Sequence, residues 1–286
     1  MQENPELPSS GERMQPGVKD ALIIIEHLHR YLLANRFCQG KSVLDIASGE
    51  GYGTEILSRY AEKVIGIDID ETAIRYSAEK YKGSNRSFRT GSATNIPLDD
   101  NSVDVVVSFE TLEHVVAQDD MLKEIRRVLR PGGILVMSTP DKKYYSEIPE
   151  YKNEFHLKEL YSHEFRDLVG RYFPHVQLLA QFAGSMSFIY PFEDPAINSY
   201  WYASGDIYGS VSESPIGSRY LIAIAGDSPV NYKQISIFDG HTIEQRLRSD
   251  DLNGVLNSRA YRLGTFLATP FRWIRRVFKM KSARDR

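Results

Sequence analysis

Two carboxylates and an imidazole stand close together in the run Glu110-Thr111-Leu112-Glu113-His114. Side chains three and four positions apart share one face of a helix, so a helical run would point Glu110, Glu113 and His114 at the same place. Carboxylate oxygens with a nitrogen ligand suit a hard divalent cation such as Mg²⁺ or Mn²⁺. A further histidine, His156, is expected on a loop that folds over the same edge of the domain. The pattern therefore indicates a candidate metal site.

Activation of a hydroxyl group is the chemistry that such a cluster suits. An alkyl hydroxyl is a poor nucleophile at neutral pH, and a bound cation lowers its pKa and orients it. A neighbouring base then accepts the proton. His114 is the candidate base if it is not a ligand, and Glu110 is the second candidate catalytic residue. The alternative is structural, with Glu113 and His114 capping and packing the helix that follows, since carboxylate clusters also serve structure.

A glycine-rich turn, Asp45-Ile46-Ala47-Ser48-Gly49-Glu50-Gly51, follows an apolar strand and leads into a helix. Glycines let the backbone approach a ligand, and a helix N-terminus favours an anionic group, so the turn predicts a nucleotide-type site. The dinucleotide fingerprint needs a third glycine where this chain has Thr54. Asp68 ends the next strand, where a carboxylate can accept both hydroxyls of a ribose. An unrelated tight turn is the alternative for the glycines alone, and Asp68 argues against it.

These candidate residues require an α/β framework. Apolar runs without strict alternation predict strands buried on both faces, and apolar residues at helical spacing predict the helices between them. The predicted strands are Lys41–Ile46, Lys63–Ile67, Ser87–Arg89, Val103–Ser108, Ile134–Ser138, Gln177–Ala180 and Tyr220–Ala225. The predicted helices are 18–36, Gly53–Tyr60, Thr72–Tyr81, Met121–Leu129 and Lys158–Val169. This alternation predicts a doubly wound, mostly parallel sheet with helices on both faces.

Four segments resemble the cofactor motifs of class I S-adenosylmethionine-dependent methyltransferases. They are Val43–Gly53, Val64–Asp70, Gly91–Asp104 and Leu129–Met137, in the family's order and at its spacing over roughly residues 40–180. The resemblance implies a Rossmann-like fold with a seven-stranded sheet. It also implies that the cofactor is S-adenosyl-L-methionine.

The same resemblance implies which residues bind the cofactor. Asp45, Gly49 and Gly51 would face the methionyl part of the cofactor. Asp68 would bind the ribose, and Ile69 would pack on the adenine. Ser92 and Ala93 would border the edge of the adenine. The family more often has an acidic residue where this chain has Ser92.

The Glu-x-x-Glu-His run resembles a second group of enzymes within this family. Quinone-biosynthesis hydroxyl methyltransferases and small-RNA terminal 2′-O-methyltransferases carry such a run after the corresponding strand, and in the RNA enzymes a later histidine completes the site. The resemblance implies that Glu110, Glu113, His114 and His156 hold Mg²⁺ or Mn²⁺. Methyl transfer to an oxygen is the reaction that this implies.

The overall composition excludes several classes of protein. The formal net charge of the chain is −3, so it is not expected to bind nucleic acid. Cys38 is the single cysteine, which excludes a disulfide framework and a thiolate zinc site. Residues 1–17 lack the basic and apolar regions of a signal peptide, and no apolar run approaches the roughly 20 residues that span a bilayer. We therefore expect a cytoplasmic protein.

The last part of the chain carries a basic amphipathic segment. As a helix, Phe271–Met280 would place Phe271, Trp273 and Phe278 on an apolar half and Arg and Lys side chains on the other half. This pattern is typical of a helix that lies on a membrane surface, here that of the inner membrane. The alternative is a helix docked on the same protein or on a partner protein.

A further resemblance bears on the substrate. Leu256–Leu263 resembles a Ser-x-x-Trp/Tyr-Arg-Leu segment at the ends of many enzymes of bacterial surface-polysaccharide biosynthesis, which include O-antigen enzymes. It implies an O-methyltransferase that acts on a sugar hydroxyl of a surface glycan, or of a lipid-linked saccharide, at the membrane. The alternatives are a small-molecule, quinone-type O-methyltransferase and a non-catalytic cofactor-binding scaffold in glycan assembly. Homo-oligomerisation is left open.

The domain organisation follows from these patterns. Residues 1–36 are predicted to form an N-terminal lid and helix, and residues 37–226 the methyltransferase domain. An aromatic-rich insert, 181–218, interrupts that domain, as long functional loops do. Residues 227–286 are predicted to be a C-terminal helical appendage that contains the basic segment.

Overall fold

The computed structural model describes residues 20–192, 200–204, 211–215 and 217–258. The chain divides into two compact units, Met1–Asp239 and Gly240–Arg286. The second unit contributes one described helix, α6 (His241–Asn257). The structure therefore puts the division after Asp239, whereas the sequence patterns put it after residue 226. The basic segment 271–280 and residues 1–19 lie outside the described residues.

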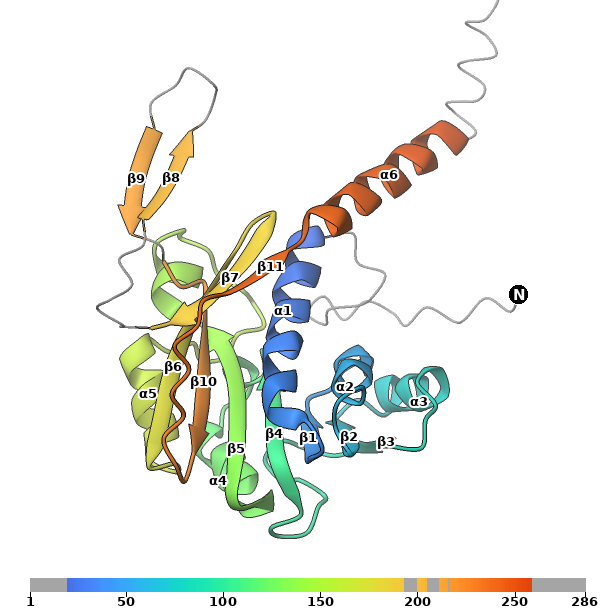
Figure 1. Cartoon of the computed structure of the whole chain (residues 1–286), viewed down its shortest axis with the longest axis vertical. Helices are drawn as coiled ribbons and strands as arrows, with labels where there is room; N and C mark the ends of the chain where they lie inside the picture. Colours follow the sequence, from blue (N-terminus) through green and yellow to red (C-terminus); the bar gives the residue numbers. More distant parts are fainter. Residues whose placement is uncertain (1–19, 193–199, 205–210, 216, 259–286) are drawn as a thin grey trace, which may run out of the picture. The chain divides into compact units, whose positions relative to one another are not determined.

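The first unit is built on one sheet of nine strands, in the order β11-β7-β6-β10-β5-β4-β1-β2-β3 (Figure 1). Its strands are β1 (Ser42–Ile46), β2 (Lys63–Asp68), β3 (Arg86–Thr90), β4 (Val103–Phe109), β5 (Leu129–Pro140), β6 (His175–Ala183), β7 (Met186–Pro191), β10 (Tyr220–Gly226) and β11 (Ser236–Asp239). The pairings from β3 to β5 are parallel, and the pairings from β5 to β11 are antiparallel. Only β7 and β10 oppose the other strands, so the expectation of a mostly parallel sheet is confirmed.

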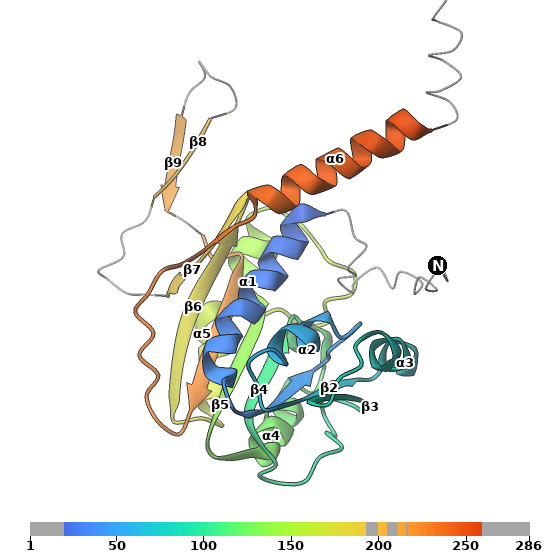
Figure 2. The same cartoon turned by 45° about the vertical axis from the view of Figure 1, so that its right-hand side comes forward.

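The helices cover both faces of this sheet (Figure 2). They are α1 (Ala21–Cys38), α2 (Tyr52–Leu57), α3 (Glu71–Lys80), α4 (Gln118–Val128) and α5 (Ser162–Gly170). Apolar side chains of α4 and α5 form one buried cluster with the sheet, and those of α1 and α2 form another. Along β4, Val106 belongs to the first cluster and Val105 and Val107 to the second. Successive strand residues point to opposite faces, which is why this strand is apolar throughout.

The sheet differs from expectation in its number of strands. Nine strands are present instead of seven, because β7 and β11 extend the sheet beyond β6. The predicted insert 181–218 therefore contains part of the sheet. β6 continues to Ala183, β7 pairs with it, and a separate hairpin of β8 (Tyr200–Ser204) and β9 (Val211–Pro215) follows. Among the described residues, no helix has the length and apolarity needed to cross a membrane.

Candidate active site

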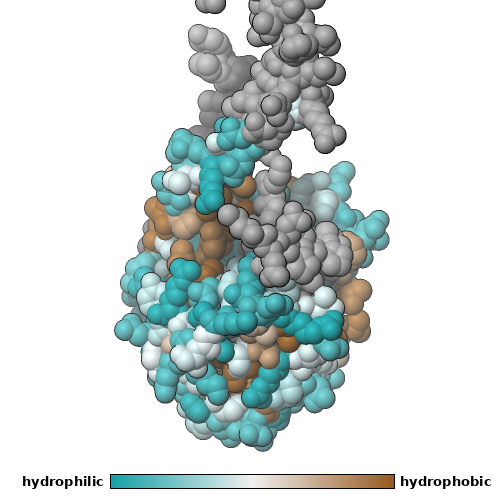
Figure 3. Space-filling model, turned by 90° about the vertical axis from the view of Figure 1, so that its right-hand side faces the viewer, coloured by the Kyte–Doolittle hydropathy of each residue, from teal (hydrophilic) through white to brown (hydrophobic). Residues whose placement is uncertain are grey.

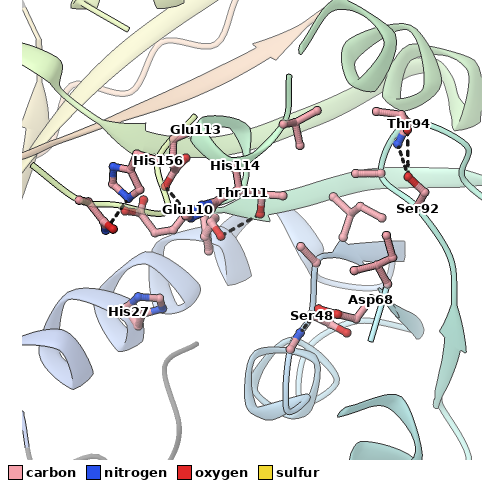
Figure 4. A pocket seen from close by; sticks show the side chains of 18 of the residues that line it. His27, Ser48, Asp68, Ser92, Thr94, Glu110, Thr111, Glu113, His114 and His156 are labelled. Carbon is pink, nitrogen blue, oxygen red and sulfur yellow. Dashed lines mark hydrogen bonds and ion pairs between the residues drawn. The ribbon is translucent and has the colours of Figure 1, made fainter. Parts of the chain in front are cut away.

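A cavity of about 880 Å³ opens at the carboxyl ends of the parallel strands. Such an edge is where α/β proteins bind ligands, and this volume suits a nucleotide-sized molecule together with a second small group. The cavity has two chemically different ends (Figure 4). Ser48 and Asp68 lie at one end, and Glu110, Glu113 and His156 gather at the other.

The glycine turn shapes the first end. Gly49 and Gly51 have φ of 53° and 78°, a region that side chains with a Cβ rarely adopt. A Cβ on Gly51 would also lie 2.7 Å from Phe88 Cε1 and from Ser77 Cβ. Gly49 lines the cavity, whereas Gly51 is the N-cap of α2 and packs against Phe88 and Ser77. Gly51 thus shapes the turn without lining the predicted cofactor position.

Asp68 joins the turn to the next strand. Its carboxylate accepts hydrogen bonds from the backbone N–H of Gly49 at 2.8 Å and of Asp70 at 2.9 Å. Asp68 lines the cavity, as does Ile69, whose side chain is 76% exposed. Ile69 therefore offers an apolar surface next to a carboxylate, which is what an adenosine needs.

Ser92 and Ala93 border the same end. Both line the cavity. The Ser92 hydroxyl is hydrogen bonded to that of Thr94 at 2.9 Å and accepts from the Thr94 backbone N–H. Hydroxyl groups therefore stand where the related enzymes more often have an acidic residue.

Asp45 lies below the cavity and does not line it. Its carboxylate accepts hydrogen bonds from Thr54 Oγ1 at 2.7 Å and from the Tyr31 hydroxyl at 3.3 Å. Burial raises the pKa of Asp45 to about 7, and these hydrogen bonds oppose that rise. Thr54, the residue that stands where a dinucleotide site needs glycine, is thus a partner of Asp45.

The run from Glu110 to His114 is not a continuous helix, which is the condition for one shared helical face. Glu110 has φ of 50°, and only Leu112–His114 forms a single 3₁₀ turn before α4 begins at Gln118. The Glu110 carboxylate accepts a hydrogen bond from Ser138 Oγ at 2.6 Å and lies 3.7 Å from Arg30 Nη1. The expectation of one shared helical face is wrong, because the backbone turns sharply at Glu110.

Three of the four predicted ligands lie together nevertheless. Glu113, His114 and His156 each have a ligand atom within 4.8 Å of the others, and Glu110 is outside this group. Glu113 is fully buried, and burial together with the charge of Glu110 raises the pKa of its carboxyl group well above the ordinary range. Its Oε2 accepts from Thr139 Oγ1, whereas Oε1 has no hydrogen-bond partner among the described residues.

Both histidines are held at Nδ1, and Nε2 of His156 accepts a hydrogen bond from Asn153 Nδ2 at 3.0 Å. Nδ1 of His156 is hydrogen bonded to the carboxylate of Glu159, and Nδ1 of His114 lies 3.1 Å from the carbonyl oxygen of Phe155. A neutral imidazole that donates from Nδ1 keeps a lone pair on Nε2. His114 Nε2 is 3.8 Å from Glu113 Oε1. The cluster therefore offers oxygen and nitrogen donors that converge.

The sequence patterns missed several residues that line the cavity. His27 comes from α1, Tyr52 from α2 and Tyr220 from β10, while Tyr145 and Asn153 follow β5. Tyr145 stacks on His156 and also contacts Tyr220. Except for Tyr52, these residues come from parts of the chain that carry no cofactor motif, so the tertiary fold brings them together.

Comparison with known proteins places this geometry in a family. Residues 44–137 match a family model described as a methyltransferase domain. This segment is similar to a methyltransferase domain. It contains the glycine turn, Asp68 and the cluster from Glu110 to His114.

Relatives of the methyltransferase domain occur in mycobacteria. A Mycolicibacterium smegmatis protein described as a probable S-adenosylmethionine-dependent methyltransferase is 36% identical over 165 residues, 57% of this chain and 63% of that protein. A similarly described Mycobacterium tuberculosis protein is 36% identical over 133 residues, 46% and 48% of the two chains. The phthiotriol/phenolphthiotriol dimycocerosates methyltransferase of Mycobacterium leprae is 28% identical over 165 residues, 51% and 59%. The chain spans about half to two thirds of these relatives. They support an enzyme with S-adenosylmethionine as its cofactor.

Solved structures share the fold of the methyltransferase domain. An S-adenosylmethionine-dependent methyltransferase of Thermotoga maritima superimposes with a TM-score of 0.52 at 18% identity, covering 72% of this chain and 90% of that one. A Bacillus halodurans protein gives a TM-score of 0.51 at 15% identity, covering 71% and 100%. At these identities the likeness concerns the fold alone, and it agrees with the predicted Rossmann-like architecture.

Proposed function

We propose that the protein is an S-adenosylmethionine-dependent O-methyltransferase that acts on a sugar hydroxyl of a bacterial surface glycan. The observation that carries the proposal is the division of one cavity into two ends. Asp68 and Ile69 offer a carboxylate and an apolar surface at one end, and a carboxylate–histidine cluster stands at the other. An adenosine and an oxygen acceptor need these two kinds of surface.

The residues at each end have distinct roles in this proposal. Asp68 accepts the ribose hydroxyls, Ile69 packs on the adenine, and the turn at Gly49 approaches the methionyl part. S-adenosylmethionine, when bound, supplies the methyl group. The protein then has to hold the acceptor oxygen in line with that group. His114 and Glu110, which both line the cavity, are the candidates that take the hydroxyl proton.

A divalent cation, Mg²⁺ or Mn²⁺, fits the acceptor end. Glu113, His114 and His156 would hold it, and Glu113 Oε1 is a buried carboxylate oxygen without a hydrogen-bond partner among the described residues. Glu159 on Nδ1 of His156 is the arrangement that orients histidine ligands in metal sites. When bound, the cation would lower the pKa of the acceptor hydroxyl. Glu110 would not be a ligand of the cation, but its negative charge would act on the nearby site.

Aromatic side chains at the acceptor end support a sugar. Tyr145, Tyr151 and Tyr220 line the cavity beside Asn153. Aromatic faces with nearby polar groups suit a sugar ring, which has apolar faces and a hydroxyl rim. A lipid hydroxyl is the second candidate acceptor, because the Mycobacterium leprae relative is named for methylation of phthiotriol lipids.

The location of the protein is part of the proposal. The basic segment 271–280 would hold the enzyme at the cytoplasmic surface of the inner membrane, where lipid-linked saccharides are available. Deletion of residues 262–286 should then abolish binding to anionic liposomes. Unchanged liposome binding by the truncated protein would contradict this part of the proposal.

Binding and turnover test the central proposal separately. S-adenosylhomocysteine should bind the purified protein in calorimetry, and Asp68→Ala should weaken binding at least about tenfold, since it removes hydrogen bonds to a charged group. Asp99→Ala, at an exposed aspartate on a loop, is the control. Labelled methyl groups should then enter extracted lipid-linked glycans and not catechols. Transfer to catechols alone would contradict the sugar acceptor, and binding without transfer to any acceptor would favour a scaffold.

A further inference from the structure

Large apolar side chains are exposed along two segments at the acceptor end of the cavity. One segment follows the 3₁₀ turn, and the other lies between β5 and α5. The exposed fractions are 78% for Val116, 60% for Ile148, 51% for Tyr151, 47% for Phe155 and 60% for Leu157. We call these five residues the apolar rim. Scattered apolar residues are ordinary on protein surfaces, but a group of them beside a site indicates a binding surface.

Four of the five rim residues are connected to the mouth of the cavity, two as lining residues and two through their backbone. Val116 and Tyr151 line the cavity themselves. The backbone N–H of Leu157 donates to the carbonyl oxygen of Glu113 at 2.8 Å. His114 Nδ1 contacts the carbonyl oxygen of Phe155 at 3.1 Å. The exposed apolar side chains therefore lie next to the candidate ligands at the acceptor end of the cavity.

The charges between these residues argue against a flat anionic bilayer as the occupant. Between β5 and α5 the chain has five acidic residues and four lysines, so basic residues are not in excess; they are Asp141, Glu147, Glu150, Glu154 and Glu159, and Lys142, Lys143, Lys152 and Lys158. A surface that rests on anionic lipid needs an excess of Lys and Arg. Figure 3 shows one face of the molecule, on which brown apolar patches lie among hydrophilic residues. Exposed apolar side chains interspersed with charges of both signs fit a single hydrocarbon chain better than a membrane plane.

We infer that the apolar rim binds the hydrocarbon chain of an amphiphilic acceptor whose hydroxyl-bearing head group enters the cavity. This inference rests on the proposed function, because it assumes that the acceptor occupies the Glu113–His156 end. The head group contacts the polar cluster, and the chain leaves along Val116, Tyr151 and Leu157. A free sugar or a nucleotide-sugar lacks the hydrocarbon chain that the apolar rim would bind.

Alkyl glucosides of increasing chain length are suitable probes. Hexyl, octyl and decyl β-glucoside, below their micelle-forming concentrations, are titrated into protein saturated with S-adenosylhomocysteine. Affinity should rise with each methylene, by at most about fourfold, which is the factor for 0.8 kcal/mol per buried CH₂. The variant Ile148→Ser/Leu157→Ser should lose most of this dependence on chain length. The control Ile235→Ser/Ile237→Ser changes two exposed isoleucines elsewhere and should keep it.

The outcomes separate this inference from the proposed function. If the wild type does not bind S-adenosylhomocysteine, the proposed function fails. If it binds S-adenosylhomocysteine but shows equal affinity for the three glucosides, only the present inference fails. A chain-length dependence that survives in Ile148→Ser/Leu157→Ser also overturns it. Loss of binding to phosphatidylglycerol vesicles in that variant, with glucoside binding unchanged, would instead assign the apolar rim to a membrane contact.

Discussion

Arg30 of α1 and Glu110 at the end of β4 face each other inside the protein, with Arg30 Nη1 3.7 Å from Glu110 Oε1. Arg30 is completely buried, donates to Gln181 Oε1 at 2.9 Å and stacks on Tyr220. The charge of Glu110 helps to raise the pKa of Arg30 although burial opposes it. The helix that precedes the methyltransferase domain therefore supplies the positive charge beside a candidate catalytic carboxylate.

Loss of this arginine should destabilise the fold strongly. Arg30→Met leaves Glu110 without its buried partner, and breaking such a pair costs about 3–5 kcal/mol. Urea unfolding measures the effect. Arg36→Met changes an exposed arginine of the same helix and should cost less than about 1 kcal/mol. Adding Glu110→Gln to Arg30→Met should restore part of the loss, and equal effects of Arg30→Met and Arg36→Met would contradict the pairing.

Two glycines in the left-handed region form a matched pair for testing the cofactor turn. Gly51→Ala combines an unfavourable φ of 78° with contacts of 2.7 Å to Phe88 and Ser77. Gly40→Ala has a similar φ of 66° but open space around the new Cβ. Backbone strain alone costs about 1–2 kcal/mol. Gly40→Ala should cost that amount, whereas Gly51→Ala should cost clearly more and weaken S-adenosylhomocysteine binding. Similar unfolding free energies for the two variants would argue against tight packing beneath the turn.

The central strands of the sheet were predictable because each is marked by its own short apolar run in the sequence. The strands at Lys41–Ile46, Lys63–Ile67 and Val103–Ser108 were found within two residues, since buried parallel strands are apolar throughout. The strands β7 and β11 were missed, because they extend the antiparallel side of the sheet beyond β6 and lack the continuous apolar run of the central strands. Edge pairing depends on tertiary neighbours more than on composition.

The candidate site was predictable only in part. The glycine turn and Asp68 carry a motif with fixed spacing, and the structure places Gly49, Asp68 and Ile69 along the cavity. The turn at Glu110 was not predictable from helical periodicity, because a positive φ at a glutamate is held by surrounding contacts. The burial of Arg30 was also missed, since arginine is rarely buried unless it is paired.

Stability should fall as pH rises through the range in which Glu26 ionises. Burial raises the pKa of Glu26 from 4.5 to about 7, although the nearby Arg30 opposes this. The folded state therefore binds a proton that the unfolded state releases between about pH 4.5 and 7. The stabilisation is fully present below pH 4.5 and is lost as pH rises through 7, by about 3 kcal/mol at most.

Glu26→Gln tests this dependence, since the amide cannot ionise. The unfolding free energy of the wild type relative to the variant should decrease between pH 4.5 and 7.5. Glu79→Gln, at an exposed glutamate on α3, should show no such change. A constant difference in unfolding free energy between the wild type and Glu26→Gln across this range would show that burial does not raise the pKa of Glu26.

Metal binding should depend on Glu113 and His156. Calorimetric titration with Mn²⁺ should detect a site that Glu113→Gln abolishes and that Glu159→Gln weakens by about 10–100-fold, because Glu159 orients His156. Glu154→Gln, at an exposed neighbour, is the control. EDTA should then lower methyl transfer, and Mn²⁺ or Mg²⁺ should restore it. A methyl-transfer rate that changes neither with EDTA nor with added metal would exclude a catalytic cation.

The position of β10 has a consequence for how the protein is made. Residues 220–226 insert between β5 and β6, which emerge much earlier from the ribosome. β5 and β6 gain their shared neighbour only when β10 has been synthesised, and domains generally fold as units. Tyr220, the first residue of β10, lines the acceptor side of the cavity. A chain that ends before residue 220 would keep the residues of the cofactor turn but lack both the strand that joins β5 to β6 and this part of the acceptor wall.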